Sequence, residues 1–144
     1  LKIHYYKNAQ EEKTPIILLH GVMDNGLCMI QLAETLSGNF NVFMPDFREH
    51  GKTESRSHEK LTVHQLVADI AQFIQHLQLP PVILIGHSLG GSTSALLSAK
   101  YSHLIKKQII IDPGITVRKT MNLKIILMGV AFWVISWENE KIFS

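Results

Sequence analysis

Residues 86–90 read Gly-His-Ser-Leu-Gly, which is the spacing of a tight turn that presents a nucleophilic serine. The turn follows the apolar run Val82–Ile85, which is typical of a buried strand, and precedes a helical pattern over Ser92–Tyr101. Small glycines on both sides of Ser88 let the strand and the helix approach each other around a strained backbone. Ser88 Oγ would then project at the carboxyl end of a sheet, where α/β sheets bind ligands. The pattern predicts nucleophilic attack by Ser88 on a carbonyl carbon.

A serine nucleophile needs hydrogen-bond donors for the negative charge that develops on the substrate oxygen. The backbone amide of Leu89 directly follows the nucleophile and would be one donor. The amide of Val22 would be the second, because it follows the apolar run Ile16–Leu19 and Gly21 frees the backbone there. Losing one such donor typically raises the reaction barrier by roughly 3–4 kcal/mol.

Several other chemistries are excluded by composition and spacing. No Gly-x-Gly occurs, so the dinucleotide-binding fingerprint is absent, and residues 51–53 lack the earlier glycine of a phosphate loop because Asp46 stands there. Lys and Arg number 14 against 12 for Asp and Glu, which is too weak an excess for a nucleic-acid surface. The single cysteine, Cys28, allows neither an intrachain disulfide nor a cysteine-rich zinc site. The scattered histidines show no metal-ligand spacing beside a carboxylate, so we expect no metal and no cofactor.

Apolar patterns along the chain alternate between strands and helices. Continuous apolar runs predict buried strands, helical spacing predicts helices, and Thr62 with Gln65 forms a capping box. The predicted strands cover residues 1–6, 16–19, 41–44, 82–85 and 108–111, and the predicted helices cover 29–36, 63–77 and 92–101. This alternation is typical of a parallel α/β sheet with right-handed crossovers. A chain of 144 residues that is 46% apolar suits one domain of this class.

Three segments, in this order along the chain, resemble the α/β-hydrolase superfamily. Residues 20–22 read His-Gly-Val, 45–51 read Pro-Asp-Phe-Arg-Glu-His-Gly, and 86–91 read Gly-His-Ser-Leu-Gly-Gly, each after a predicted strand. The resemblance covers residues 1–114 and implies the α/β-hydrolase fold, a mostly parallel sheet with helices on both faces. It implies Ser88 as the nucleophile and the amides of Leu89 and Val22 as the oxyanion hole. In the middle segment it implies a structural role for Asp46, Arg48, His50 and Gly51, whereas Glu49 stands where the family often has glycine.

The resemblance further implies a substrate pocket and a catalytic triad. Met23, Leu27 and His87 would line the pocket. Asp112, at the end of the strand after the nucleophile helix, is a candidate acid, with a helix or turn cap as the alternative. The family's histidine base follows the last strand, but no histidine follows His103 here. The fold is therefore expected to be truncated after the strand that follows the nucleophile helix.

Two functions are compatible with these residues. The first is a serine hydrolase that acts on a carboxylic ester or related acyl compound through an acyl-enzyme on Ser88. Its base is missing here, so a complementing C-terminal segment would supply it, and its partner would be a small-molecule acyl substrate. The second is a non-catalytic truncated product or a binding module of the same fold. Losing the histidine of a triad typically costs about 10⁶ in turnover, so a natural length of 144 residues would mean inactivity.

The last part of the chain has a different character. We assign residues 1–114 to the hydrolase core and 115–144 to the start of a helical, apolar cap or lid. The thirteen residues Ile125–Trp137 are almost wholly apolar but fall short of the ~20 that a spanning helix needs. A helix that packs against protein absent here is favoured over membrane contact through 125–137. A sheet cut after its fourth buried strand would expose an edge and favour aggregation. A lone cysteine is compatible with a cytoplasmic location, which we expect.

Overall fold

The computed structural model describes residues 1–54, 61–113 and 134–138. The strands are β1 (Tyr5–Lys7), β2 (Pro15–Leu19), β3 (Asn41–Pro45), β4 (Val82–His87), β5 (Ile105–Ile111) and β6 (Val134–Glu138). The α-helices are α1 (Ile30–Leu36), α2 (Val63–His76) and α3 (Leu89–Lys100), and the short 3₁₀ helices are η1 (Gly26–Met29) and η2 (Ser102–Leu104).

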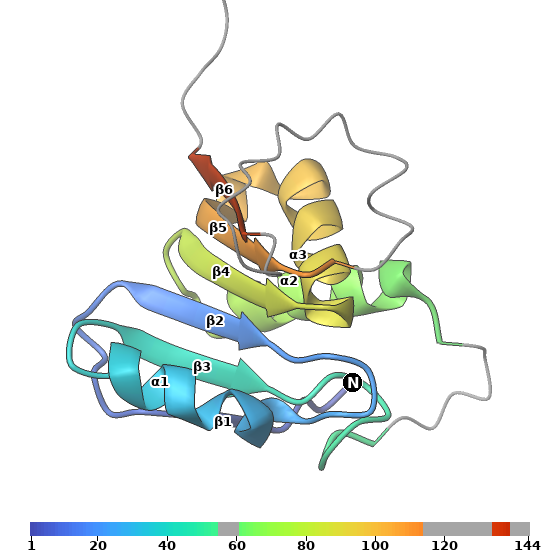
Figure 1. The fold of residues 1–144 in the computed structure, drawn as a ribbon, viewed down its shortest axis with the longest axis horizontal. Helices are drawn as coiled ribbons and strands as arrows, with labels where there is room; N and C mark the ends of the chain where they lie inside the picture. The colour runs from blue at the N-terminus through green and yellow to red at the C-terminus, as the bar shows by residue number, and fades with distance from the viewer. Residues whose placement is uncertain (55–60, 114–133, 139–144) are drawn as a thin grey trace, which may run out of the picture.

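The described strands form one sheet in the order β1-β3-β2-β4-β5-β6 (Figure 1). The four central strands, β3, β2, β4 and β5, run parallel, while β1 and β6 are antiparallel to their neighbours at the two edges. The parallel sheet that the alternating pattern predicts is therefore confirmed. Leu19 of β2 pairs with Gly86 of β4, so the carboxyl ends of these two strands lie side by side.

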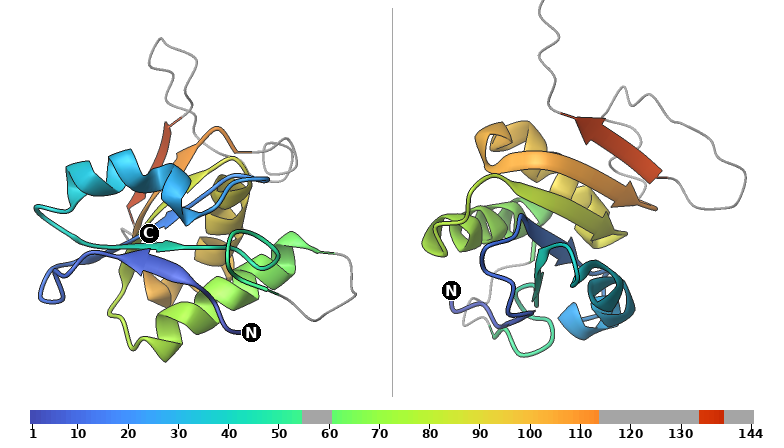
Figure 2. Two further views of the ribbon diagram at one scale, coloured as in Figure 1. Left: turned by 90° about the horizontal axis from the view of Figure 1, so that it is seen from below. Right: turned by 90° about the vertical axis from the view of Figure 1, so that its left-hand side faces the viewer.

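Helices cover both faces of the sheet, as expected. Helix α1 lies on one face, and α2 and α3 lie on the other (Figure 2). All residues of β2 are buried because its side chains alternate between two apolar clusters. Ile17 and Leu19 pack with residues of α2, whereas Ile16 and Leu18 pack with Ala33 of α1.

Helix α2 begins where the capping box predicts. Thr62 Oγ1 accepts the Gln65 amide at 3.3 Å, and the Gln65 side chain accepts the Thr62 amide at 2.9 Å. The helix ends at His76, before the proline pair at 80–81. Its apolar face packs onto the sheet, on the face opposite α1.

Some predicted boundaries are wrong. The first strand begins at Tyr5 rather than residue 1, and the fifth begins at Ile105 rather than 108. The helix predicted from Ser92 begins at Leu89, because the serine turn leads into it directly.

The prediction of a helix over 125–137 is wrong for residues 134–137, which belong to β6. Strand β6 pairs with β5 over Lys107–Ile111, so the edge that we expected to be open is covered along this stretch. An unpaired strand edge offers free N–H and C=O groups, and the β-branched and aromatic residues of β6 suit a strand. The rest of the predicted helix, 125–133, lies outside the described residues. Within the described part, no helix has the length and apolar character needed to cross a membrane.

Candidate active site

Ser88 occupies a strained turn between β4 and α3. Its backbone has φ 51° and ψ −111°, in the left-handed half of conformational space that non-glycine residues rarely adopt. The Ser88 amide donates to the carbonyl of Ile111 at 2.9 Å, and its own carbonyl accepts the Ser92 amide at 3.0 Å. The turn is thus held by β5 on one side and by α3 on the other. Strain of this kind persists only where the surroundings enforce it, and it is common at functional sites.

Two glycines allow this turn to form. A Cβ on Gly86 would overlap the carbonyl oxygen of Gly90, and a Cβ on Gly90 would overlap the carbonyl oxygen of Leu19. Both obstacles are backbone atoms, which cannot rotate away as a side chain would. The spacing of the motif therefore reflects close approach of α3 to the ends of β4 and β2.

The loop after β2 is joined directly to the serine turn. The amide of Gly90 donates to the carbonyl of His20 at 3.0 Å. Leu89 is the first residue of α3, and the first amides of a helix have no acceptor within it. Val22, two residues after His20, is 60% exposed. The structure thus brings together the two segments that carry the predicted oxyanion donors.

His20 is fully buried and packs within this loop. Its Nε2 accepts the Phe47 amide at 3.0 Å, and its Nδ1 lies 2.7 Å from the Gly21 carbonyl oxygen. Burial lowers the pKa of His20, because the charged imidazolium would lose its hydration. The ring is therefore neutral at pH 7.

Asp46, also fully buried, anchors the loop after β3. Its carboxylate accepts the amides of Gly26 at 2.7 Å and Lys52 at 2.9 Å, and it lies 3.0 Å from His4 Nδ1. Burial alone would raise the pKa of Asp46, but these hydrogen bonds outweigh it and hold the pKa below its usual value. Gly51, at φ 53°, leaves space for the same carboxylate.

Comparison with known proteins identifies the family. The sequence pattern of the family described as alpha/beta hydrolase fold matches residues 14–142. This chain belongs to the α/β-hydrolase family.

Some of the relatives are esterases or lipases by name, and others carry other names, such as epoxide hydrolase 4. A putative esterase/lipase of Haemophilus influenzae is 32% identical over 113 residues, covering 78% of this chain and 39% of that protein. The sn-1-specific diacylglycerol lipase ABHD11 of Xenopus tropicalis is 30% identical over 110 residues, covering 74% of this chain and 34% of that protein. The structure of a marine microorganism esterase superposes with a TM-score of 0.70 at 30% identity, covering 76% of this chain and 41% of that one. The chain thus spans about two fifths or less of the length of these α/β-hydrolases.

Of the predicted pocket residues, Met23 and Leu27 follow β2, and His87 is the last residue of β4. His87 is half-buried and lies close to Gly21. If Gly21 carried a Cβ atom, that atom would lie 3.3 Å from Nδ1 of His87. The Asp24 carboxylate would lie 3.0 Å from the same atom. Met23 is 92% exposed at φ 64°, and Leu27 is exposed as well. Their contact with substrate stays a prediction.

Asp112 lies at the carboxyl end of β5, beside Ser88 at the end of β4. It follows Ile111, whose carbonyl accepts the Ser88 amide, and its backbone has φ 43°. The residue is exposed at the end of β5. Its role as the catalytic acid also stays a prediction. Over residues 1–54 and 61–113, no group of three His, Cys, Asp or Glu side chains could hold a metal ion.

Asp69 was overlooked in the sequence. It lies on the apolar face of α2, between Leu66 and Phe73, and is almost fully buried. Both of its carboxylate oxygens accept from the Arg48 guanidinium, at 2.7 and 2.8 Å, so that α2 is tied to the loop after β3. A lone carboxylate on an apolar helix face is a signal that could have revealed this pair.

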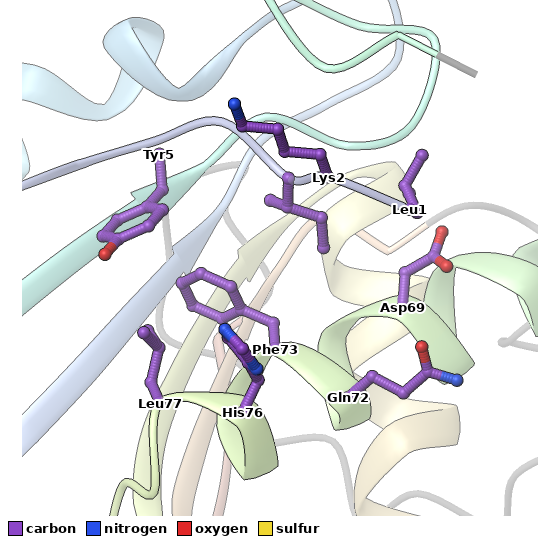
Figure 3. A pocket seen from close by; sticks show the side chains of 9 residues that line it. Leu1, Lys2, Tyr5, Asp69, Gln72, Phe73, His76 and Leu77 are labelled. Carbon is purple, nitrogen blue, oxygen red and sulfur yellow. The ribbon is translucent and has the colours of Figure 1, made fainter. Parts of the chain in front are cut away.

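Two cavities lie away from the serine turn. One, of about 510 Å³, opens between the first residues of the chain and α2, where Tyr5, Phe73 and His76 line it (Figure 3). The other, of about 620 Å³, opens at the amino ends of the strands beside Pro15 and Asn41. Neither is lined by residues 20–22 or 86–90, so neither belongs to the candidate active site.

Proposed function

We propose that this chain is the nucleophile-bearing part of a serine hydrolase that cleaves a carboxylic ester or related acyl compound. The observation that carries the proposal is the strained backbone of Ser88, held between β5 and α3 and joined to the loop after β2 through Gly90 and His20. The names of the esterase and lipase relatives support the same class of substrate.

The proposed reaction has two stages. Ser88 Oγ attacks the substrate carbonyl carbon while a base takes the hydroxyl proton, and the amides of Leu89 and Val22 stabilise the oxyanion. The intermediate collapses, the alcohol leaves with the proton, and an acyl-enzyme remains on Ser88. Water, deprotonated by the same base, then releases the carboxylic acid and restores the serine. Asp112 is our candidate for orienting the base.

The proposal assigns no residue of this chain as the base. Family members use a histidine late in the chain, and no histidine follows His103. We therefore assign the base to a complementing C-terminal segment. The competing function is a non-catalytic module that uses the same fold to bind acyl compounds.

A fluorophosphonate probe distinguishes the two functions, because it reacts only with an activated serine. When a complementing C-terminal segment is supplied, we expect labelling of the wild type and none of Ser88→Ala, while Ser37→Ala, which changes a partly exposed serine, labels like the wild type. Circular dichroism shows whether each variant is folded. If folded wild-type protein does not label when supplied with a complementing C-terminal segment, the hydrolase proposal fails and the binding module is favoured.

A further inference from the structure

His20 connects three parts of the candidate site. Both ring nitrogens and the backbone carbonyl are engaged, and the side chain has no exposed surface. The Phe47 amide can only donate, so Nε2 of His20 carries no proton. The neutral ring therefore carries its proton on Nδ1, where it donates to the Gly21 carbonyl 2.7 Å away.

The acceptor of this bond belongs to the peptide group that bears the Val22 amide. A trans peptide is planar, so the Gly21 carbonyl and the Val22 N–H point in opposite directions. A bond that fixes the carbonyl also fixes the direction of the N–H. This matters because Gly21 has no side chain to restrict its backbone.

We propose that His20 is the positioning residue of the oxyanion hole, whose ring holds the Gly21–Val22 peptide with the Val22 N–H directed toward the substrate oxygen. The inference rests on the proposed function, since it assigns Val22 as an oxyanion donor. The His20 carbonyl meanwhile accepts the Gly90 amide. One residue thus sets the position of the loop relative to the serine turn, and its ring sets the orientation of the donor.

The same geometry makes the arrangement dependent on a neutral ring. If His20 were protonated, Nε2 would carry an N–H that faces the Phe47 N–H. Two donors cannot form a hydrogen bond, so the bond from Phe47 would be lost. Burial and the His50 ring, whose centroid is 5.3 Å away, oppose protonation. The charges of Asp46 and Asp24 favour it, but the net effect is a lowered pKa of His20. At neutral pH the neutral ring therefore keeps both bonds, the one from the Phe47 amide to Nε2 and the one from Nδ1 to the Gly21 carbonyl.

Nuclear magnetic resonance of the wild-type protein tests the first step without any variant. Long-range ¹H–¹⁵N spectra distinguish the protonated from the unprotonated nitrogen of each histidine. We expect the proton of His20 on Nδ1 and a bare Nε2. A proton on Nε2 would overturn the inference, because the ring could then not donate to Gly21.

Two variants separate the two ring bonds. His20→Asn can place an N–H near the position of Nδ1, and His20→Gln can place an acceptor near that of Nε2. We expect the residual dipolar coupling of the Val22 N–H to match the wild type in His20→Asn and to change in His20→Gln. An unchanged Val22 coupling in His20→Gln, with the fold intact, would contradict the proposal. If either variant fails to fold, the wild-type proton position decides.

Reactivity provides a separate measurement on the protein supplied with its complementing segment. Because one oxyanion donor is typically worth 10²–10³ in turnover, we expect His20→Gln to lower kcat by about 10²-fold with little change in KM. His20→Asn should retain most of kcat. If Ser88 is never labelled by the probe, the hydrolase function is refuted. The proton position and the Val22 coupling still test the role of His20 in that case.

Discussion

Replacing Asp46 with asparagine tests how firmly the loops around the site are anchored. In the wild type, one carboxylate oxygen accepts the Gly26 amide, and the other accepts the Lys52 amide and faces His4 Nδ1. An asparagine amide has one oxygen and one NH₂ group. In either orientation, the NH₂ group faces a backbone N–H, and two donors cannot form a hydrogen bond with each other.

The expected loss follows from these contacts. A hydrogen bond to a charged group contributes about 1.5–3 kcal/mol, and a buried polar group left without a partner costs about 1–3 kcal/mol more. We therefore expect Asp46→Asn to lower the free energy of unfolding by about 3–5 kcal/mol at pH 7. Because native proteins are stable by only about 5–15 kcal/mol, this change would be large.

Urea unfolding followed by circular dichroism measures this loss. Glu12→Gln, the same type of change on an exposed side chain, should stay within about 0.5 kcal/mol of the wild type. The pKa of Asp46 is lowered in the folded protein, so its stabilisation is complete above the unfolded value of about 3.9 and is lost as the pH falls through the folded value. The wild type and Asp46→Asn should therefore converge in acid. A loss below about 1 kcal/mol at pH 7, or a difference that persists in acid, would refute the reasoning.

Two further substitutions test the packing around the site. Gly90→Ala forces a Cβ against a backbone carbonyl of β2, so we expect severe destabilisation by thermal unfolding, whereas Gly38→Ala, with open space around it, should be neutral or slightly stabilising. Arg48→Ala leaves the carboxylate of Asp69 buried and unpaired, so it should cost about 3–5 kcal/mol in urea unfolding, and adding Asp69→Ala should recover part of the loss. A double variant no more stable than Arg48→Ala would argue against the pair.

The features predicted correctly are those encoded locally. A capping box is contained within four residues, so Thr62 and Gln65 suffice to place the start of α2. The continuous apolar run Ile16–Leu19 can be satisfied only by burial on both faces, which led to a central strand. The glycines around Ser88 likewise indicated a tight turn between a strand and a helix.

The features that were missed depend on contacts between distant segments. Strand β6 is a strand because it pairs with β5, and its apolar residues alone fit a buried helix equally well. The bond from Gly90 to His20 joins two loops that no periodic pattern relates. The donor and acceptor roles of the His20 ring follow only from its neighbour Phe47, which the sequence alone does not place beside it.

The pairing of Leu19 with Gly86 has a consequence for folding. These strands are far apart in the sequence, and contacts of this kind form slowly because a long loop must close first. The backbone strain of Ser88 depends on that closure, since the carbonyls of Leu19 and His20 are what Gly90 packs against. In a chain that has collapsed but has not finished folding, Ser88 would therefore lack its strained backbone conformation. Its strained backbone would form only at the end of folding, so a partly folded chain would lack the geometry on which the proposed reaction depends.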